Sequence, residues 1–99
     1  MIPLRWTPVA ATDLEEIKAY IEQEDTDAAA NVIRHILERA EQLRGFPESG
    51  APLREKRHAN DRMRFLPVQS YLLFYLYNGK QVSVIRVLHA RREYLSLLR

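Results

Sequence analysis

The sequence predicts an α+β fold, in which an antiparallel helical hairpin packs on one face of a small antiparallel sheet in the order β-α-α-β-β-β. Two neighbouring stretches in the first half repeat apolar residues at helical spacing, and two β-rich runs near the end flank Asn78-Gly79. Helices that precede the strands, rather than alternating with them, are typical of α+β proteins. A chain of 99 residues with 46% hydrophobic content supports one core, so we expect a single domain over residues 1–99.

The first elements are an N-terminal strand and a helix with a clear start. The strand is expected in IPLRW, residues 2–6. Thr7 is suited to cap the helix, and Pro8 fits the first helical position, where its missing N–H costs nothing. From Ala10 to Ile21, apolar residues recur at spacings of four, three and four, which places them along one side of the helix.

A second helix follows after a short polar link. The Asp-Thr-Asp sequence at 25–27 offers a cap, and Gly45 with Pro47 ends the helix. Between them, apolar residues from Ala29 to Leu43 repeat the same rhythm. Two helices of similar length joined in this way indicate an antiparallel hairpin.

Residues 46–64 are expected to form an exposed loop, because they hold two prolines, one glycine and five basic side chains after residue 53. RFLPV, residues 64–68, is predicted to be a strand in which Pro67 marks an edge, an end or a bulge. The residues after the last strand form either a short helix or a tail.

The strongest local signal is a β-hairpin in residues 70–89. Asn78-Gly79 is the preferred pair for a two-residue type I′ turn. That register predicts two faces: Tyr71, Leu73, Tyr75, Tyr77 and Arg86 on one, and Leu72, Phe74, Leu76, Ile85 and Val87 on the other. We expect the second, apolar face to cover the helices and the tyrosine face to be partly open to a partner. The alternative is that the tyrosine rings pack and leave their hydroxyls at the surface.

Charge is distributed unevenly along the chain. Residues 1–53 hold 5 Lys or Arg and 10 Asp or Glu, a net charge of −5, whereas residues 54–99 hold 10 and 3, a net charge of +7. This polarity indicates that the second half presents a positive surface to an anionic partner; the alternative is ordinary charge on solvated helices. No cysteine, signal peptide or long apolar stretch is present, so we expect a cytoplasmic protein that does not enter the membrane.

Three patterns together resemble one known family. They are W…A…DL..I..YI at 6–21, L..FP..G at 43–50, and YLLFYLYNGKQVSVIRVLHARRE at 71–93. These resemble the RelE/ParE superfamily of toxins from bacterial type II toxin–antitoxin modules, over almost the whole chain. The resemblance implies the α+β fold, a small basic toxin, a cognate antitoxin that wraps across its surface, and contact with operator DNA only through the antitoxin complex.

The superfamily divides by target. RelE-like members cleave messenger RNA on the ribosome, whereas ParE-like members inhibit DNA gyrase. RNA-cleaving members tend to carry an arginine where this sequence has Leu72. Some of these members also have several lysines in the loop before the sheet, where this sequence has only one, Lys56, beside Arg54 and Arg57. The terminal RVLHARRE is typical of ParE-like members. The resemblance therefore favours gyrase; the alternatives are a RelE-like endoribonuclease and an inactive homologue kept for antitoxin binding.

The candidate site residues follow from these alternatives. RNA cleavage needs cations for the transition state and groups that move protons, and histidine, here His89, is the side chain most often used for proton transfer. The nuclease candidates are Arg64, Arg86, His89, Arg91 and Tyr94. For target binding the expected residues are Arg62, Arg64, Tyr71, Arg86, His89, Arg91 and Arg92. For antitoxin binding they are Arg54, Arg57, Tyr75 and Tyr77.

Several candidates also have a purely structural interpretation. His89 at a strand end can hydrogen-bond neighbouring backbone, and Arg86, expected opposite Tyr71, can form an internal ion pair or stack. No spacing of histidines and carboxylates suggests a metal, and no glycine-rich phosphate loop or acyl-transfer triad is present, so we expect no cofactor and no metal site.

Overall fold

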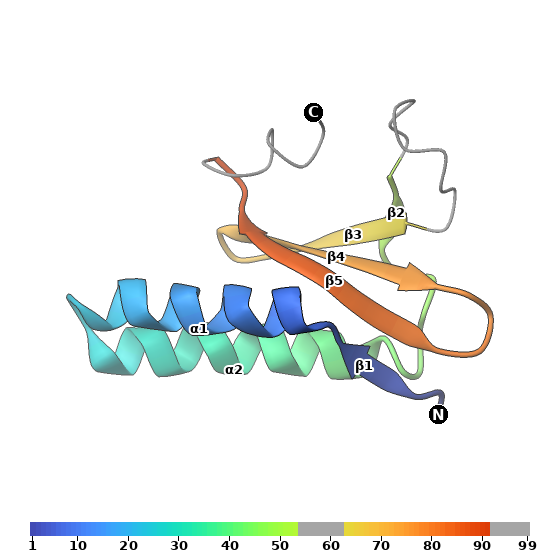
Figure 1. The fold of residues 1–99 in the computed structure, drawn as a ribbon, viewed down its shortest axis with the longest axis horizontal. Coiled ribbons are helices and arrows are strands. Elements are labelled where there is room, and N and C mark those ends of the chain that lie inside the picture. Colours follow the sequence, from blue (N-terminus) through green and yellow to red (C-terminus); the bar gives the residue numbers. More distant parts are fainter. Residues whose placement is uncertain (54–62, 92–99) are drawn as a thin grey trace.

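The computed structural model describes residues 1–53 and 63–91, and it confirms the predicted order of helices and strands (Figure 1). Thr7 caps the first helix by accepting a hydrogen bond from the Ala10 N–H at 3.2 Å, and Asp25 caps the second through the Ala28 N–H at 3.0 Å. The elements are β1 (Leu4–Trp6), α1 (Pro8–Glu22), α2 (Thr26–Gln42), β2 (Ala51–Pro52), β3 (Met63–Val68), β4 (Tyr71–Tyr77) and β5 (Val82–His89).

The strands form one sheet in the order β1-β5-β4-β3-β2. The pairs β2–β3, β3–β4 and β4–β5 are antiparallel, as predicted for the last three strands, whereas β1 runs parallel to β5 and makes the sheet mixed. Parallel pairing is possible because two helices and three strands lie between β1 and β5 in the chain, a connection long enough to bring β5 alongside β1 in the same direction. The short β2, within the segment expected to be a loop, pairs with the start of β3.

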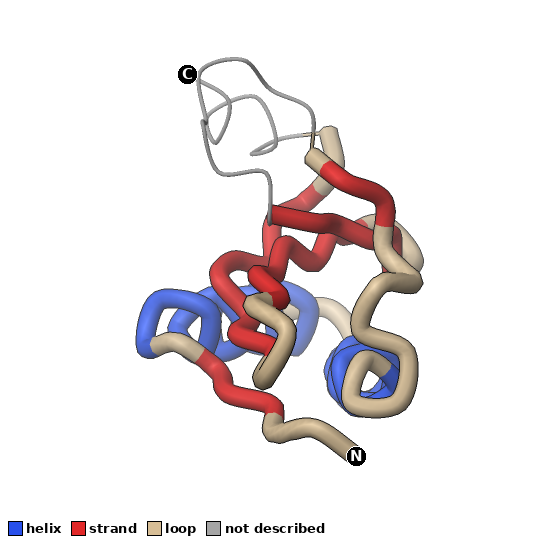
Figure 2. The backbone as a smooth tube through the Cα atoms, turned by 90° about the vertical axis from the view of Figure 1, so that its right-hand side faces the viewer, coloured by secondary structure: helices blue, strands red, loops and turns tan. Residues whose placement is uncertain are grey.

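Both helices lie on the same side of the sheet (Figures 1 and 2). α1 contacts β5, and α2 contacts β3. Small side chains allow this close packing, because Ala10, Ala29 and Ala40 are all fully buried. The helical pair therefore forms one layer and the sheet the other.

The hairpin register differs from the prediction. Tyr77 pairs with Val82, so the connection is the four-residue segment 78–81 rather than a two-residue turn. The Asn78 carboxamide oxygen accepts hydrogen bonds from the N–H groups of Lys80 and Gln81, both at 2.8 Å, and Gly79 adopts a φ of 90°. The Asn side chain thus satisfies the backbone of a wider loop.

The expectation about the two faces of the sheet was also wrong. Tyr71, Leu73 and Tyr75 belong to the main core cluster together with the helices, while Phe74 and Leu88 form a second cluster with Leu53. Successive side chains of a strand point to opposite faces, so the tyrosine face is the one that the helices cover. The rings of Tyr71 and Tyr75 supply apolar area to the core and are not open to a partner, whereas Tyr77 is half-buried.

Candidate functional site

Arg86 is held by a carboxylate of the first helix. Its Nε donates to Asp13 Oδ2 at 2.8 Å and its Nη2 donates to Asp13 Oδ1 at 3.1 Å, a two-point contact between β5 and α1. The Val87 N–H also donates to Asp13 Oδ2, at 2.9 Å. Asp13 is 6% exposed, so its charge is balanced inside the protein rather than by water. The structural interpretation of Arg86 as an internal ion pair is confirmed.

His89 lies at the end of β5 and opposite Tyr71, the residue that was expected to face Arg86. The two rings meet edge to face, with centroids 5.4 Å apart and an interplanar angle of 85°. His89 Nδ1 accepts a hydrogen bond from the Arg91 N–H at 3.2 Å. A ring nitrogen that accepts carries a lone pair, so in the neutral ring the proton is on Nε2. In this arrangement Nε2 carries the proton and the Nδ1 lone pair is used by the Arg91 N–H.

Arg64 lies at the opposite end of the sheet from His89 and supports a loop. Its Nη1 donates to the carbonyl oxygens of Glu48 at 3.1 Å and Gly50 at 2.7 Å, and its Nη2 approaches Glu48 Oε2 at 3.4 Å. The strand pairing sets Arg64 opposite Tyr75. Its cationic head therefore holds segment 46–50 against the sheet.

Tyr75 fastens the same loop from inside. Its side chain is fully buried, and its hydroxyl accepts from the Gly50 N–H at 2.9 Å and donates to the Pro47 carbonyl at 2.8 Å. Burial raises the pKa of the Tyr75 hydroxyl above its usual range, although the Gly50 N–H and the nearby Arg64 oppose the shift. Tyr75 is thus a core residue, and the structure removes it from the surface on which an antitoxin was expected to contact it.

The structure therefore divides the predicted site residues into two groups. Tyr71, Arg86, His89 and Arg91 belong to the last part of the hairpin, whereas Arg64 lies beside Tyr75. Tyr71 and Tyr75 are four residues apart along β4, which separates the two groups by about 13 Å along the strand. Arg64 does not join the His89 group to form a single cationic centre.

The remaining candidates differ in their accessibility. Arg91 is exposed, and Tyr77 is half-buried against the main core. Five predicted site residues lie outside the residues that the structure describes: Arg54, Arg57, Arg62, Arg92 and Tyr94.

Two residues that organise this region were missed from the sequence. Asp13 entered the sequence analysis only as the D of the pattern at residues 6–21, because its partner lies 73 residues away. Gly50 was treated as a loop glycine, yet a Cβ there would lie 2.7 Å from the Tyr75 hydroxyl oxygen and 2.8 Å from the Phe65 carbonyl oxygen. The FP..G pattern was the available signal, since a glycine at a fixed distance from a helix end indicates a close approach.

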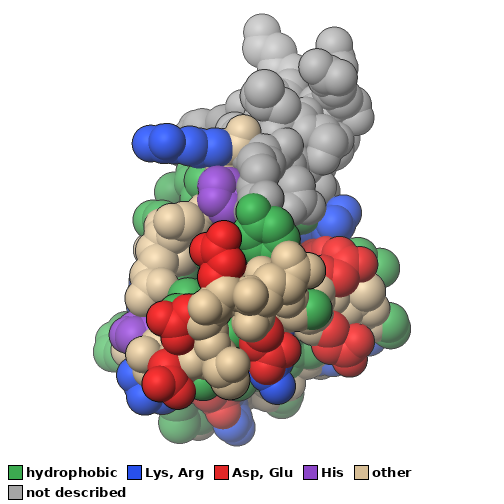
Figure 3. All heavy atoms as spheres, turned by 90° about the vertical axis from the view of Figure 1, so that its left-hand side faces the viewer, with side chains coloured by type: hydrophobic (Ala, Val, Ile, Leu, Met, Phe, Trp, Pro, Cys, Tyr) green, Lys and Arg blue, Asp and Glu red, His purple; other side chains and the backbone are tan. Residues whose placement is uncertain are grey.

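Acidic side chains gather on the end of the molecule where the helices connect, as Figure 3 shows, in agreement with the negative first half of the sequence. No helix among the residues that the structure describes is long and apolar enough to span a bilayer. Within residues 1–53 and 63–91, no three His, Asp or Glu side chains group in a way that could hold a metal ion.

Comparison with known proteins gives a consistent result at the sequence level. A family model described as "ParE toxin of type II toxin-antitoxin system, parDE" matches residues 4–94. The chain is 36% identical over 95 residues to "Putative toxin Y4kP" from Sinorhizobium fredii (strain NBRC 101917 / NGR234), which covers 96% of this chain and 95% of that protein.

Two solved structures have a similar fold. One is a chain of the chromosomal ParDE system from P. aeruginosa, with a TM-score of 0.72 and 22% identity, covering 92% of this chain and 98% of that one. The other is a chain of the toxin–antitoxin complex RelBE2 from Mycobacterium tuberculosis, with a TM-score of 0.65 and 23% identity, covering 89% and 96%. Since one comes from a ParDE system and the other from a RelBE complex, the fold alone does not select a target.

Proposed function

The chain belongs to the ParE family of toxins from type II toxin–antitoxin systems, and from this premise we propose that it stops growth by binding DNA gyrase until a cognate antitoxin neutralises it. The proposed action is binding, without chemistry on the target. The part of the molecule proposed to make the contact is the end of β5, with the half-buried His89 and the exposed Arg91.

One observation carries the preference for binding over RNA cleavage: two of the three arginines expected to assist cleavage, Arg64 and Arg86, already have structural partners. Arg86 is bound to the Asp13 carboxylate, and Arg64 is bound to loop carbonyls. Stabilising a developing phosphorane-like charge requires donors aimed at the position where that charge forms. Arginines that hold a helix and a loop in place are not directed at a substrate.

The state of His89 supports the same preference. A general base needs a free lone pair within reach of the 2′-hydroxyl proton. The Nδ1 lone pair of His89 is used by the Arg91 N–H, and its ring is fixed against Tyr71. Arg62 and Arg92, which the sequence also predicts to bind the target, lie outside the residues that the structure describes.

The first experiment is to pulse-label new DNA and new protein during the first minutes after induction of this chain without an antitoxin. We expect DNA synthesis to fail before translation. If translation fails first, the endoribonuclease interpretation replaces the present one, and if neither fails, the chain is an inactive homologue. Purified gyrase gives the direct measurement, since supercoiling should decline as the full chain is added.

Variants of the β5 end test the contact surface. Arg91→Glu should weaken the inhibition of supercoiling, because it reverses a charge in the proposed contact. Arg5→Glu is a matched control, since Arg5 is also an exposed arginine but lies on β1 rather than beyond the end of β5. Equal inhibition by wild type and Arg91→Glu would place the contact elsewhere.

The antitoxin proposal has a separate test. The basic second half of the chain is proposed to attract acidic side chains of the antitoxin, while Arg54, Arg57 and Tyr77 contribute contacts. The product of the adjacent gene should co-purify with this chain and restore supercoiling. Operator DNA is expected to bind the pair and not the toxin alone.

A further inference from the structure

α2 has apolar side chains on two different sides. One set, with Ala29, Ile36 and Ala40, is fully buried in the core. A second set lies beside it: Ala30 is exposed and Leu37 is 41% exposed, while the partly buried Ile33 packs against the main core and also lines this side of the helix. A surface helix normally has a single apolar stripe facing the core, so the second stripe needs another explanation.

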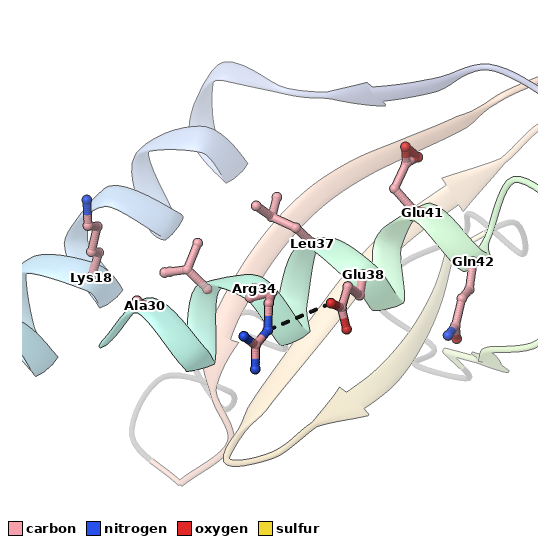
Figure 4. A pocket seen from close by; sticks show the side chains of 8 residues that line it. Lys18, Ala30, Arg34, Leu37, Glu38, Glu41 and Gln42 are labelled. Carbon is pink, nitrogen blue, oxygen red and sulfur yellow. Dashed lines mark ion pairs between the residues drawn. The ribbon is translucent and has the colours of Figure 1, made fainter. Parts of the chain in front are cut away.

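The second stripe forms the floor of a groove of about 720 Å³. Ala30, Ile33 and Leu37 supply its apolar lining, and four charged side chains stand around them: Lys18, Arg34, Glu38 and Glu41. Figure 4 shows Lys18 of α1 beside the start of α2, the Arg34–Glu38 ion pair at the middle of α2, and Glu41 near its end.

The order of these charges restricts the occupant. The groove holds two positive and two negative side chains, with the positive ones toward the N-terminal part of α2 and the negative ones toward its C-terminal part. A uniformly acidic segment or a nucleic acid would be repelled by Glu38 and Glu41. The groove instead matches an amphipathic helix that carries the same charges in the reverse direction.

A second copy of α2, turned by a two-fold rotation, is such a helix. We propose that this chain forms a symmetric dimer through the outer face of α2, with the two α2 helices antiparallel. Antiparallel packing sets Ile33 and Leu37 against Leu37 and Ile33 of the partner subunit. It also sets Arg34 beside Glu38 of the partner subunit, and symmetry repeats every contact. The inference uses the helical layer alone and does not depend on which target the toxin binds.

The charge pattern permits a test that is specific for self-association. In Arg34→Glu, positions 34 and 38 are both acidic, and in Glu38→Arg they are both basic. Each variant homodimer therefore has two repulsive contacts between position 34 of one subunit and position 38 of the other. We expect each variant to weaken dimerisation about ten- to a hundredfold. A mixture of the two variants pairs an acidic groove with a basic one, and it should therefore dimerise again. The readout is the molar mass from sedimentation equilibrium of the full chain over a concentration series.

Apolar variants provide the second arm. Leu37→Asp should give a monomer, whereas the matched control Val9→Asp should not, because Val9 is 53% exposed on α1 and does not line the groove. Circular dichroism and thermal unfolding establish that each variant is folded. Because self-association is measured without gyrase or antitoxin, its failure is distinguishable from failure of the proposed function.

The outcomes separate clearly. A wild-type dimer that Leu37→Asp dissociates, and that the mixed charge variants restore, supports the proposal. A monomeric wild type at all concentrations overturns it, as does a dimer that Leu37→Asp leaves intact. Protection of the Leu37 face by the antitoxin in a complex with a monomeric toxin would assign the groove to the antitoxin and would equally overturn it.

Discussion

At the scale of single residues, the Asp13 carboxylate of α1 binds β5, the strand that lies between β1 and β4 in the sheet. Replacing Arg86 with Met keeps the side-chain length but leaves a nearly buried carboxylate with one N–H partner. We expect a loss of about 2–4 kcal/mol in the free energy of unfolding, below the full value for buried pairs because the Arg86 side chain is one-third exposed. Urea unfolding measures it.

The control for this variant is Arg5→Met, which removes an exposed arginine from β1. Substitutions of exposed side chains rarely change stability much, so its loss should cost less than about 0.5 kcal/mol. Equal costs for Arg86→Met and Arg5→Met would show that the Asp13 contact is not structural.

Gly50 is expected to tolerate no side chain. The methyl group of Gly50→Ala would meet Tyr75 and the Phe65 carbonyl below 3 Å, and the resulting shift should cost about 1–3 kcal/mol. Gly45→Ala is the internal comparison, because its Cβ would meet nothing closer than 3.9 Å. Thermal unfolding of the two variants should differ clearly; similar midpoints would contradict the close approach.

Tyr75 should affect stability at alkaline pH. The pKa of its hydroxyl is raised above the ordinary 10.0 by burial. Above pH 10 the unfolded chain loses this proton while the folded protein keeps it, so the stability contributed by the protonated hydroxyl is present below pH 10 and declines as pH rises. Unfolding of wild type and Tyr75→Phe from pH 8 to 11 should show a steeper alkaline loss in the wild type; parallel curves would exclude the shift.

Some residue roles were predictable and others were not. Thr7 and Asp25 cap their helices as predicted, because a cap depends on neighbours within three residues. The partner of Asp13 and the approach of Gly50 to Tyr75 depend on residues brought together only by the complete fold. Local patterns carry no information on those pairings.

At the scale of elements, the connection between β4 and β5 depends on a backbone conformation at Gly79. Its φ of 90° is unfavourable for residues with a Cβ, and no atom of the described residues lies within 4 Å of a Cβ placed there. Gly79→Ala should therefore cost about 1–2 kcal/mol through backbone strain alone. Gly79→Asn should lower the free energy of unfolding by less, because asparagine adopts a positive φ more readily than alanine. Equal stability of the wild type and both variants in urea would contradict backbone strain as the cause.

The hairpin also shows where element-level prediction stops. The sequence predicted both strands and the position of their connection, but not the length of the connection or the pairing register. Asn78 stabilises a four-residue loop, and a bulge between Phe74 and Tyr75 shifts the later pairs, so that Arg86 lies opposite Phe74. A bulge has no reliable local signal in one sequence. The assignment of the covered face failed separately, because buried tyrosine was treated as less suited to a core than leucine.

At the scale of the whole molecule, the order of elements was predictable because helices and strands have different apolar periods. The parallel addition of β1 to β5 was not, because it depends on where the helical pair returns the chain. Charge is the whole-molecule property that the sequence described directly. The acidic half includes the helices, and the basic half includes the last three strands.

This charge separation leads to a prediction for the proposed antitoxin complex. If acidic side chains of the antitoxin meet the basic half, raising the salt concentration should weaken the complex, chiefly by slowing association. Surface plasmon resonance over a salt series measures both rates. An association rate independent of salt would show that charge does not guide the encounter.

The position of β5 in the sheet also determines when the protein can fold. β5 lies between β1 and β4 and provides the partners of Asp13, yet a ribosome synthesises it after all of them. A nascent chain that stops before residue 82 leaves β1 without a neighbour and Asp13 without its counter-charge. Folding must wait for these distant contacts, which is slow compared with local structure. Fragments from aborted translation should therefore be harmless, and a cell encounters the folded protein only after its last strand has been made.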